Sequence, residues 1–534
     1  MNLLISLIGD SYDDAWLAEL LDKLNIETCI VLVRDKKTAD NSVVVQKYAT
    51  HVFYHAKLKV GDYSDVMDLF NDAPPVGMDL LESFAKYESQ LFWMMERCVS
   101  VEYNHRWTDY IKHVRFWDYV LDKFNIDLFL AKGTPHEVYD YVVYVLSKGK
   151  NIKYLAGIPM AYYQRLDFVT DVYEQHPLFY DFYKMECKKW EMKSCEEIPL
   201  SKEMEEVYNF YVGNGDRTPF YMKSYAGQFR NQYVEWIYYH FAIARFIRSF
   251  KNSDGVNSYA RKLKYYIQRI KLGVQCLLRV ADFSEASYAW FENHFYIKRT
   301  YHEDEIAINY YKKQAVEVDY GKKYIYVALH MQPENTSSPL GGIYVDQALM
   351  VETLSYYAPE GWVIYVKDHP NQIKQSFRTN TSYRTIGFYQ RMLELPNVKF
   401  VSFNEDTFRL IENAQAVASL TGTVGLEAVT KGIPFLMFGY GYMQYAPNVC
   451  VIRSTGDCIK AMAYLQKATK VDDDYYKNMK IFFKVLEQSV YRCTTEWDTL
   501  RQEELEENKA LLINAYSERL MAVFGKGIFK VGDF

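Results

Sequence analysis

Three short stretches in the second half of the chain carry side chains suited to holding a phosphate and breaking a bond beside it. The first, HMQPE at 330–334, offers imidazole, amide and carboxylate groups, and the second, KDHP at 367–370, offers a lysine and a histidine. The third, SLTGT at 419–423, offers hydroxyls and a glycine that lets an anion approach the backbone. Together such donors would bind a nucleotide phosphate and stabilise it as a leaving group.

Each residue type suggests a role. Glu334 is the candidate acid/base or nucleophile towards a sugar, and His369 is the second catalytic candidate. Glu427 is expected to accept hydrogen bonds from ribose hydroxyls. The nucleotide-binding candidates are His330, Gln332, Lys367, His369, Ser419, Thr421, Gly422, Thr423 and Glu427. Plainer interpretations stay open: Thr-Gly-Thr caps an ordinary helix, Glu427 is a surface acid, and a lone histidine at a strand end is structural.

Predicted strands place these stretches together. Apolar runs at 323–329, 362–366 and 416–420 each end where one of the stretches begins. If the strands are parallel in one sheet, their carboxyl ends share an edge, where open α/β sheets bind ligands. After the third strand we expect a turn at 421–423 and a helix from Val424 to Lys431, which Gly432 ends.

The first half of the chain shows the same succession of strand, turn and helix. Residues 2–8 and 126–130 read as strands, and each is followed by a turn and a helix. Asp10, His136 and Glu137 follow these strands and are the acceptor-side candidates. Glu137 as an ordinary first-turn acid of a helix is a serious alternative.

The chain is too long for one core, and its alternating pattern predicts an α/β fold with doubly wound parallel sheets. We expect a Rossmann-like domain at 1–160, a mainly helical insertion at 161–320, a Rossmann-like nucleotide-sugar-binding domain at 321–470 and C-terminal helices at 471–534.

Composition narrows the function. The net charge of −6 gives no support to nucleic-acid binding. The eight cysteines show no CxxC spacing, which argues against a zinc site or a disulfide framework and suits a reducing cytoplasm.

The first residues, MNLLISLIGD, read as a first strand and not as a signal peptide, and no apolar run of about 18 residues is present. No DxD-type pair stands in a convincing context, so the sequence names no metal ligand and leaves metal dependence open. We expect no cofactor.

One basic amphipathic segment, residues 261–271, carries Arg261, Lys262, Lys264 and Arg269 beside an apolar stripe. Such a helix can rest on an anionic membrane surface. A solvated helix packed on a core is the favoured interpretation. Peripheral contact with the inner face of the cytoplasmic membrane is therefore a secondary expectation.

Several strings resemble a known family. These are YVALHMQPENTSSPLGG at 326–342, GWVIYVKDHPNQ at 361–372, LPNVKFV at 395–401 and AVASLTGTVGLEAVTKGIPFLMFG at 416–439. They are similar to bacterial capsule and lipopolysaccharide biosynthesis proteins, namely the β-Kdo-transferase-like glycosyltransferases. The segment DLFLAKGTPHEVYDYVVYVL at 127–146 is more weakly similar to the N-terminal domain of that group.

The resemblance implies a GT-B arrangement, in which two Rossmann-like domains face a cleft. It implies a cytoplasmic, retaining glycosyltransferase that takes an acidic sugar such as Kdo from a CMP-linked donor to a glycan or glycolipid acceptor. His369-Pro370 corresponds to a His-Pro pair whose histidine contacts the CMP phosphate. Glu334 stands where the family pattern favours aspartate. Open alternatives are a UDP-sugar 2-epimerase, a polyol-phosphate transferase and a non-catalytic capsule assembly or export component.

Overall fold

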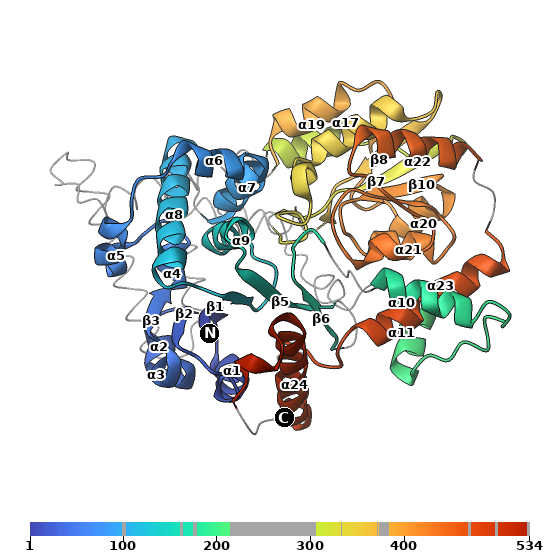
Figure 1. Cartoon of the computed structure of the whole chain (residues 1–534). Coiled ribbons are helices and arrows are strands. Elements are labelled where there is room, and N and C mark those ends of the chain that lie inside the picture. Colours follow the sequence, from blue (N-terminus) through green and yellow to red (C-terminus); the bar gives the residue numbers. More distant parts are fainter. Residues whose placement is uncertain are drawn as a thin grey trace, which may run out of the picture. The chain divides into compact units, whose positions relative to one another are not determined.

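The computed structural model describes residues 1–98, 103–160, 164–174, 179–213, 267, 306–332, 334–370, 372, 384–467, 471–496 and 500–530. All of these except residue 267 belong to one compact unit formed by Met1–Gly215 and Tyr301–Phe534. Two six-stranded sheets organise this unit, and Figure 1 shows the helices that cover them.

The first sheet has the strand order β3-β2-β1-β4-β5-β6. Its strands are parallel except β6, which runs antiparallel to β5. Its strands are β1 Asn2–Ile8, β2 Thr28–Val33, β3 His51–Tyr54, β4 Leu128–Ala131, β5 Lys153–Pro159 and β6 Leu166–Val169. Strands β1 and β4 are neighbours, so the segments that follow them leave the sheet at the same edge.

Helices cover both faces of this sheet because its strands are apolar on both sides. The helices in this part of the chain are α1 Ser11–Asp22, α2 Lys36–Asn41, α3 Val43–Tyr48, α4 His55–Leu58, α5 Met67–Asp72, α6 Met78–Phe84, α7 Glu88–Cys98, α8 Tyr103–Lys123 and α9 Tyr139–Gly149. Buried residues of α8 and α9 pack on one face. Those of α1 and of the C-terminal α24 (Leu505–Phe524) pack on the other.

The second sheet has the order β12-β11-β10-β7-β8-β9, and every strand is parallel to its neighbours. Counted from its own first strand, this is the Rossmann order 3-2-1-4-5-6 of the first sheet. Its strands are β7 Tyr324–Ala328, β8 Val363–Lys367, β9 Val398–Phe400, β10 Ala416–Ser419, β11 Phe435–Met437 and β12 Val449–Val451.

The second sheet is also covered on both faces. Its own connecting helices are α17 Gln347–Tyr357, α19 Ile386–Leu393, α20 Thr407–Asn413, α21 Val424–Val429 and α22 Thr455–Lys467. Helices α17, α19 and α22 share one buried cluster with the sheet. On the opposite face the cluster includes α10 (Phe179–Lys189), α11 (Lys202–Val212) and α23 (Asp473–Ser489).

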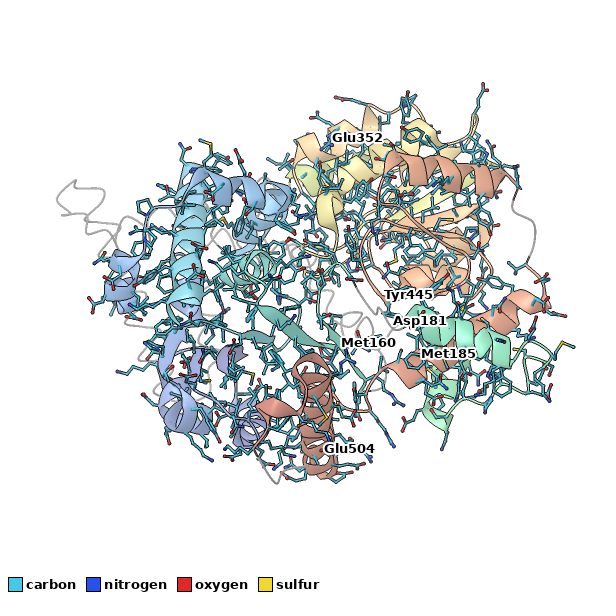
Figure 2. The ribbon with its side chains drawn as sticks, viewed as in Figure 1. Met160, Asp181, Met185, Glu352, Tyr445 and Glu504 are labelled. Atoms are coloured by element: carbon cyan, nitrogen blue, oxygen red, sulfur yellow. The ribbon has the colours of Figure 1, made fainter. Side chains whose placement is uncertain are left out.

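Aromatic contacts join elements that are far apart in the sequence. Phe179, at the start of α10, stacks on Tyr445 with ring centroids 5.0 Å apart, and Figure 2 labels Tyr445 beside α10. Trp16 of α1 stacks on Tyr516 of α24 at 4.8 Å, which brings the C-terminal helix back to the first sheet (Figure 1). Aromatic pairs of this kind add about 0.5–1.5 kcal/mol beyond the area they bury.

The predicted α/β fold with two doubly wound Rossmann-like sheets is confirmed. Strand β5 runs unbroken from Lys153 to Pro159, and β6 pairs with it in the antiparallel sense. The helix expected at 424–431 ends two residues early, at Val429, and Gly432 follows it with φ +77°. The domain limits at 160, 320 and 470 stay predictions. The basic segment 261–271 lies outside the described residues, apart from Ile267.

None of the described helices combines the length and apolar character needed to cross a bilayer.

Candidate functional site

The loops after β7, β8 and β10 leave one edge of the second sheet. The three strands are adjacent in the order β10-β7-β8, and Ala328 at the end of β7 pairs in register with Lys367 at the end of β8. Their carboxyl ends therefore lie at one level, as the sequence predicts. We call residues 328–332, 334–336, 367–369 and 419–423 together the phosphate rim.

His330 joins two parts of this rim. Its Nδ1 lies 3.2 Å from the Ser419 hydroxyl, and its Nε2 lies 3.3 Å from the Thr421 hydroxyl. Ser419 donates its own proton to the Ala328 carbonyl at 2.6 Å, and Thr421 donates to the Thr336 carbonyl at 3.2 Å. Either ring nitrogen of His330 can therefore donate to the hydroxyl beside it.

Burial keeps His330 uncharged. The residue is 8% exposed. Burial, with smaller contributions from the nearby charges of His369 and Arg384, lowers the pKa of His330 to about 3. A neutral imidazole is therefore expected at physiological pH. The electrostatic effect of His369 also shows that the His-Pro segment lies close to His330.

Gly422 is needed for close approach to this histidine. A Cβ at position 422 would lie 3.1 Å from Cε1 of His330 and 3.5 Å from Oγ of Ser419. Its neighbour Thr423 donates to the Glu427 carboxylate at 3.4 Å, one turn into α21. The Thr-Gly-Thr turn is thus packed against His330 and does more than connect β10 to α21.

Arg384 ties the loop after β7 to the loop after β8. Its guanidinium makes a bidentate pair with Asp368, with Nε to Oδ2 at 2.7 Å and Nη2 to Oδ1 at 2.9 Å. It also donates to the Gln332 side-chain oxygen at 2.6 Å and to the His330 carbonyl at 2.9 Å. Arg384 is 1% exposed, so the pair is shielded from water.

Asp368 in turn positions His369. The backbone N–H of His369 donates to Oδ1 of Asp368 at 2.7 Å, and Tyr389 donates its hydroxyl to Oδ2 at 2.6 Å. The backbone N–H of Asp368 donates to the Tyr311 hydroxyl at 3.1 Å. These bonds fix the backbone from which the His369 side chain projects.

Lys367 and Glu427 form the polar floor of the rim. Lys367 Nζ donates to the Glu405 carbonyl at 2.6 Å and to the Thr407 hydroxyl at 2.8 Å, which leaves its third N–H for a ligand. Burial lowers the pKa of Lys367 to about 8, although Asp406, Glu405 and Glu427 oppose the shift. Glu427 is 6% exposed and therefore is not a surface acid.

Glu334 occupies the exposed side of the rim. Its Oε2 accepts from the Thr336 hydroxyl at 3.1 Å, and the Thr336 carbonyl accepts from Thr421 at 3.2 Å. Two hydrogen bonds therefore connect Glu334 to the loop after β10.

Gln332 is placed differently, because it is buried and only 3% exposed. Its amide nitrogen donates to the Val345 carbonyl at 2.9 Å, and its side-chain oxygen accepts from Arg384. Both polar atoms of this side-chain amide form hydrogen bonds within the protein, so Gln332 has a positioning role in this structure.

The acceptor-side candidates lie at the carboxyl edge of the first sheet. Asp10 caps α1, and its carboxylate accepts from the N–H groups of Tyr12 and Asp13, each at 3.0 Å. Glu137 pairs with Lys59 at 2.8 Å, and one of its oxygens lies 3.6 Å from Nε2 of His136.

A strained turn holds His136 and Glu137 above Asp140. Val138 has φ 69° and ψ −73°, and Tyr139 N–H donates to the Glu137 carbonyl at 2.9 Å, which forms a γ-turn that a β-branched residue rarely adopts. Asp140 compensates by accepting from the N–H groups of His136 and Glu137, at 3.1 and 2.7 Å. Burial raises the pKa of Asp140 to about 6. Asp140, four residues after His136, therefore holds the turn that carries both candidates.

No group of three or more His, Cys, Asp or Glu side chains in the described part of the chain is arranged to hold a metal ion.

Comparison with protein families supports the resemblance seen in the sequence. Residues 297–446 match the family model described as "capsule polysaccharide biosynthesis protein". The predicted family resemblance is confirmed. The matched stretch contains β7, β8 and β10 together with the whole phosphate rim. A comparison with curated proteins finds no match.

Several solved structures align with this chain at low identity. A UDP-GlcNAc 2-epimerase of Methanocaldococcus jannaschii covers 91% of this chain and 99% of its own, with 11% identity and a TM-score of 0.23. A glycosyltransferase of Rickettsia africae ESF-5 covers 98% and 99%, with 8% identity and a TM-score of 0.24. KpsC, a beta Kdo 2,7 transferase of Thermosulfurimonas dismutans, covers 46% and 66%, with 15% identity and a TM-score of 0.22. The strand orders described above define the fold of this chain.

Proposed function

We propose that this chain is a glycosyltransferase that moves an acidic, Kdo-like sugar from a CMP-linked donor to a surface polysaccharide or lipid-linked glycan. The observation that carries the proposal is the meeting of three loops around His330, inside the stretch that matches the capsule polysaccharide biosynthesis family. The three loops contribute a carboxylate at Glu334, an imidazole at His369 and a hydroxyl at Thr421. These are groups that could bind the phosphate of a nucleotide-sugar donor and react with its sugar.

The phosphate of CMP is assigned to the side chains of His369 and Thr421. Ser419 is 1% exposed and its hydroxyl donates to the Ala328 carbonyl, so Ser419 is assigned to positioning His330. In the cationic form, Lys367 adds a positive charge from the floor of the rim, where burial strengthens its effect on a developing phosphate charge. Glu427 lies beside Lys367 and is assigned to the ribose hydroxyls. Asp368 and Arg384 act through His369 and His330 and are positioning residues.

Glu334 is assigned to the reacting sugar. Its carboxylate is exposed, and Thr336 connects it to the loop that carries Thr421. Attack of this carboxylate on the anomeric carbon would break the bond to the CMP phosphate and give a glycosyl-enzyme intermediate, and attack by the acceptor hydroxyl would then complete a retaining transfer. His136 and Glu137 are assigned to the acceptor side. We place the reaction in the cytoplasm, where the donor is available.

Thermal-shift titration tests the donor. CMP is expected to raise the melting temperature more than UDP does, and His369→Ala is expected to lose most of the CMP shift. His105→Ala serves as the matched control, because His105 is an exposed histidine of α8. A larger shift with UDP would contradict the CMP assignment and favour the UDP-sugar epimerase alternative. An unchanged CMP shift in His369→Ala would remove His369 from the site.

A further inference from the structure

A cavity of about 340 Å³ opens beside the phosphate rim. Residues of two regions line it: Lys86, Gln90 and Tyr173 from the first half of the chain, and Gly342, Tyr440 and Arg453 from the second. The cavity is large enough for a sugar unit, and none of the groups assigned to the phosphate, the ribose or the reacting sugar lines it.

The lining of this cavity is cationic although the whole chain is acidic. Three basic side chains and no Asp or Glu line it, whereas the net charge of the chain is −6. Lys148 is neutralised by an ion pair with Asp171. Neither Lys86 nor Arg453 forms an ion pair among the described residues. Asp457, which acts on the Arg453 charge, accepts from the Arg453 backbone N–H at 3.1 Å and does not line the cavity, so two positive charges face the cavity.

Gln90 supplies an unused donor. The residue is 3% exposed, and its side-chain oxygen accepts from the Ser89 hydroxyl at 2.9 Å. Its backbone carbonyl accepts from Ser338 at 3.1 Å. No hydrogen-bond partner for its amide nitrogen is found in the described residues. This N–H₂ group is therefore available to a ligand in the cavity.

Aromatic rings and backbone carbonyls hold Arg453 in place in the cavity wall. The guanidinium of Arg453 lies 4.0 Å from the ring centroid of Tyr440, and Tyr173 packs against that ring edge-to-face at 4.8 Å. Arg453 also donates to the Gly439 carbonyl at 2.7 Å and to the Met437 carbonyl at 3.3 Å. Arg453 thus holds a fixed cation beside flat apolar surfaces, an arrangement that suits a sugar ring bearing an anionic group.

Backbone hydrogen bonds connect the cavity to the phosphate rim. The N–H of Tyr440 donates to the Leu340 carbonyl at 2.8 Å, and the N–H of Gly439 donates to the Leu420 carbonyl at 3.0 Å. Leu420 directly precedes Thr421 of the rim. A molecule in the cavity would therefore lie next to the place assigned to the donor.

We propose that this cavity binds a carboxylate-bearing sugar unit of the glycan acceptor. Lys86 and Arg453 receive the carboxylate, the Gln90 amide donates to a ring hydroxyl, and Tyr440 and Tyr173 contact the apolar face of the ring. This assignment rests on the proposed glycosyltransferase function and specifies its acceptor class as an acidic glycan.

Calorimetric titration of the full chain with tetragalacturonate, and with neutral maltotetraose as the matched probe, tests the proposal. Tetragalacturonate is expected to bind at least about tenfold more tightly than maltotetraose. Lys86→Gln is expected to weaken tetragalacturonate binding by about tenfold, while Lys86→Arg retains it. Lys36→Gln, which changes an exposed lysine of α2, should bind like the unmodified chain.

Binding of CMP to the same variants separates this proposal from the proposed function. CMP affinity should be unchanged in Lys86→Gln. Equal binding of the two tetrasaccharides, no binding of tetragalacturonate, or an unchanged affinity in Lys86→Gln would overturn the cavity assignment even if CMP binds as expected. If Lys86→Gln weakens binding of a CMP-linked acidic sugar but not of tetragalacturonate, the cavity belongs to the donor and the acceptor assignment is wrong. Absence of CMP binding in the unmodified chain would contradict the donor assignment, whatever the tetrasaccharides do.

Discussion

Asp368 and Arg384 face each other as a buried bidentate ion pair, with N–O distances of 2.7 and 2.9 Å and exposed fractions of 1% for each residue. Asp368 precedes His369, and Arg384 reaches across to the His330 carbonyl. One ion pair therefore sets the spacing of the two loops that carry the histidines of the site.

Removing the arginine should destabilise the fold. Arg384→Met leaves the Asp368 carboxylate buried without its cation, and we expect a loss of about 3–5 kcal/mol in the free energy of unfolding. Chemical denaturation measures the change. Arg391→Met is the control, because Arg391 makes a similar bidentate pair with Glu352 while 41% exposed, and its loss should cost about 1 kcal/mol or less. Equal losses in the two variants would contradict the role given to Arg384.

The neutral state of His330 predicts a pH dependence of stability. The folded chain holds this histidine with a pKa of about 3, whereas the unfolded chain protonates it near pH 6.5. The unfolded state then binds more protons below pH 6.5, so stability falls as the pH is lowered through this range. Between pH 7 and pH 5 the contribution is about 2 kcal/mol. In urea unfolding, His330→Asn should lose this part of the pH dependence of the free energy of unfolding. His105→Asn, which removes an exposed imidazole, should keep it.

Lys367 predicts a second pH effect, on binding. Its pKa of about 8 means that the ammonium form, which attracts phosphate, disappears as the pH rises above 8. CMP affinity is therefore expected to fall by about tenfold between pH 7 and pH 9. Lys367→Gln should bind weakly and without this slope. Lys399→Gln, which alters an exposed lysine of β9, should retain it. A slope that persists in Lys367→Gln would assign the effect to another group.

Glu334 and His369 should govern turnover. We expect Glu334→Gln and His369→Ala each to lower the release of CMP from a CMP-linked acidic sugar by about 10²-fold or more. Glu394→Gln, at an exposed position after α19, serves as the control and should react normally. Full turnover in Glu334→Gln would show that this carboxylate does not take part in the reaction.

Strand ends were predictable because parallel strands leave a simple signal. Apolar runs gave β1 and β7 within a residue at each end, and they brought the residues of the rim to one edge. Short edge strands were missed. Strand β12, Val449–Val451, has only three residues, and so short an apolar run does not distinguish a strand from other structure.

Arg384 escaped prediction for a different reason. Its importance comes from a partner that the fold supplies, Asp368, and spacing in the sequence does not reveal such pairs. A buried aspartate requires a compensating group, so the apolar strand leading into Asp368 is the signal that a cation should be sought nearby. Similarly, the cavity next to the rim is lined from both halves of the chain and leaves no local motif.

A crystal structure of the chain with CMP tests the central claim most directly. The account predicts the phosphate within hydrogen-bond distance of His369 and of the Thr421 hydroxyl, with the ribose beside Glu427. A nucleotide bound elsewhere, or a phosphate that contacts none of these side chains, would contradict the account.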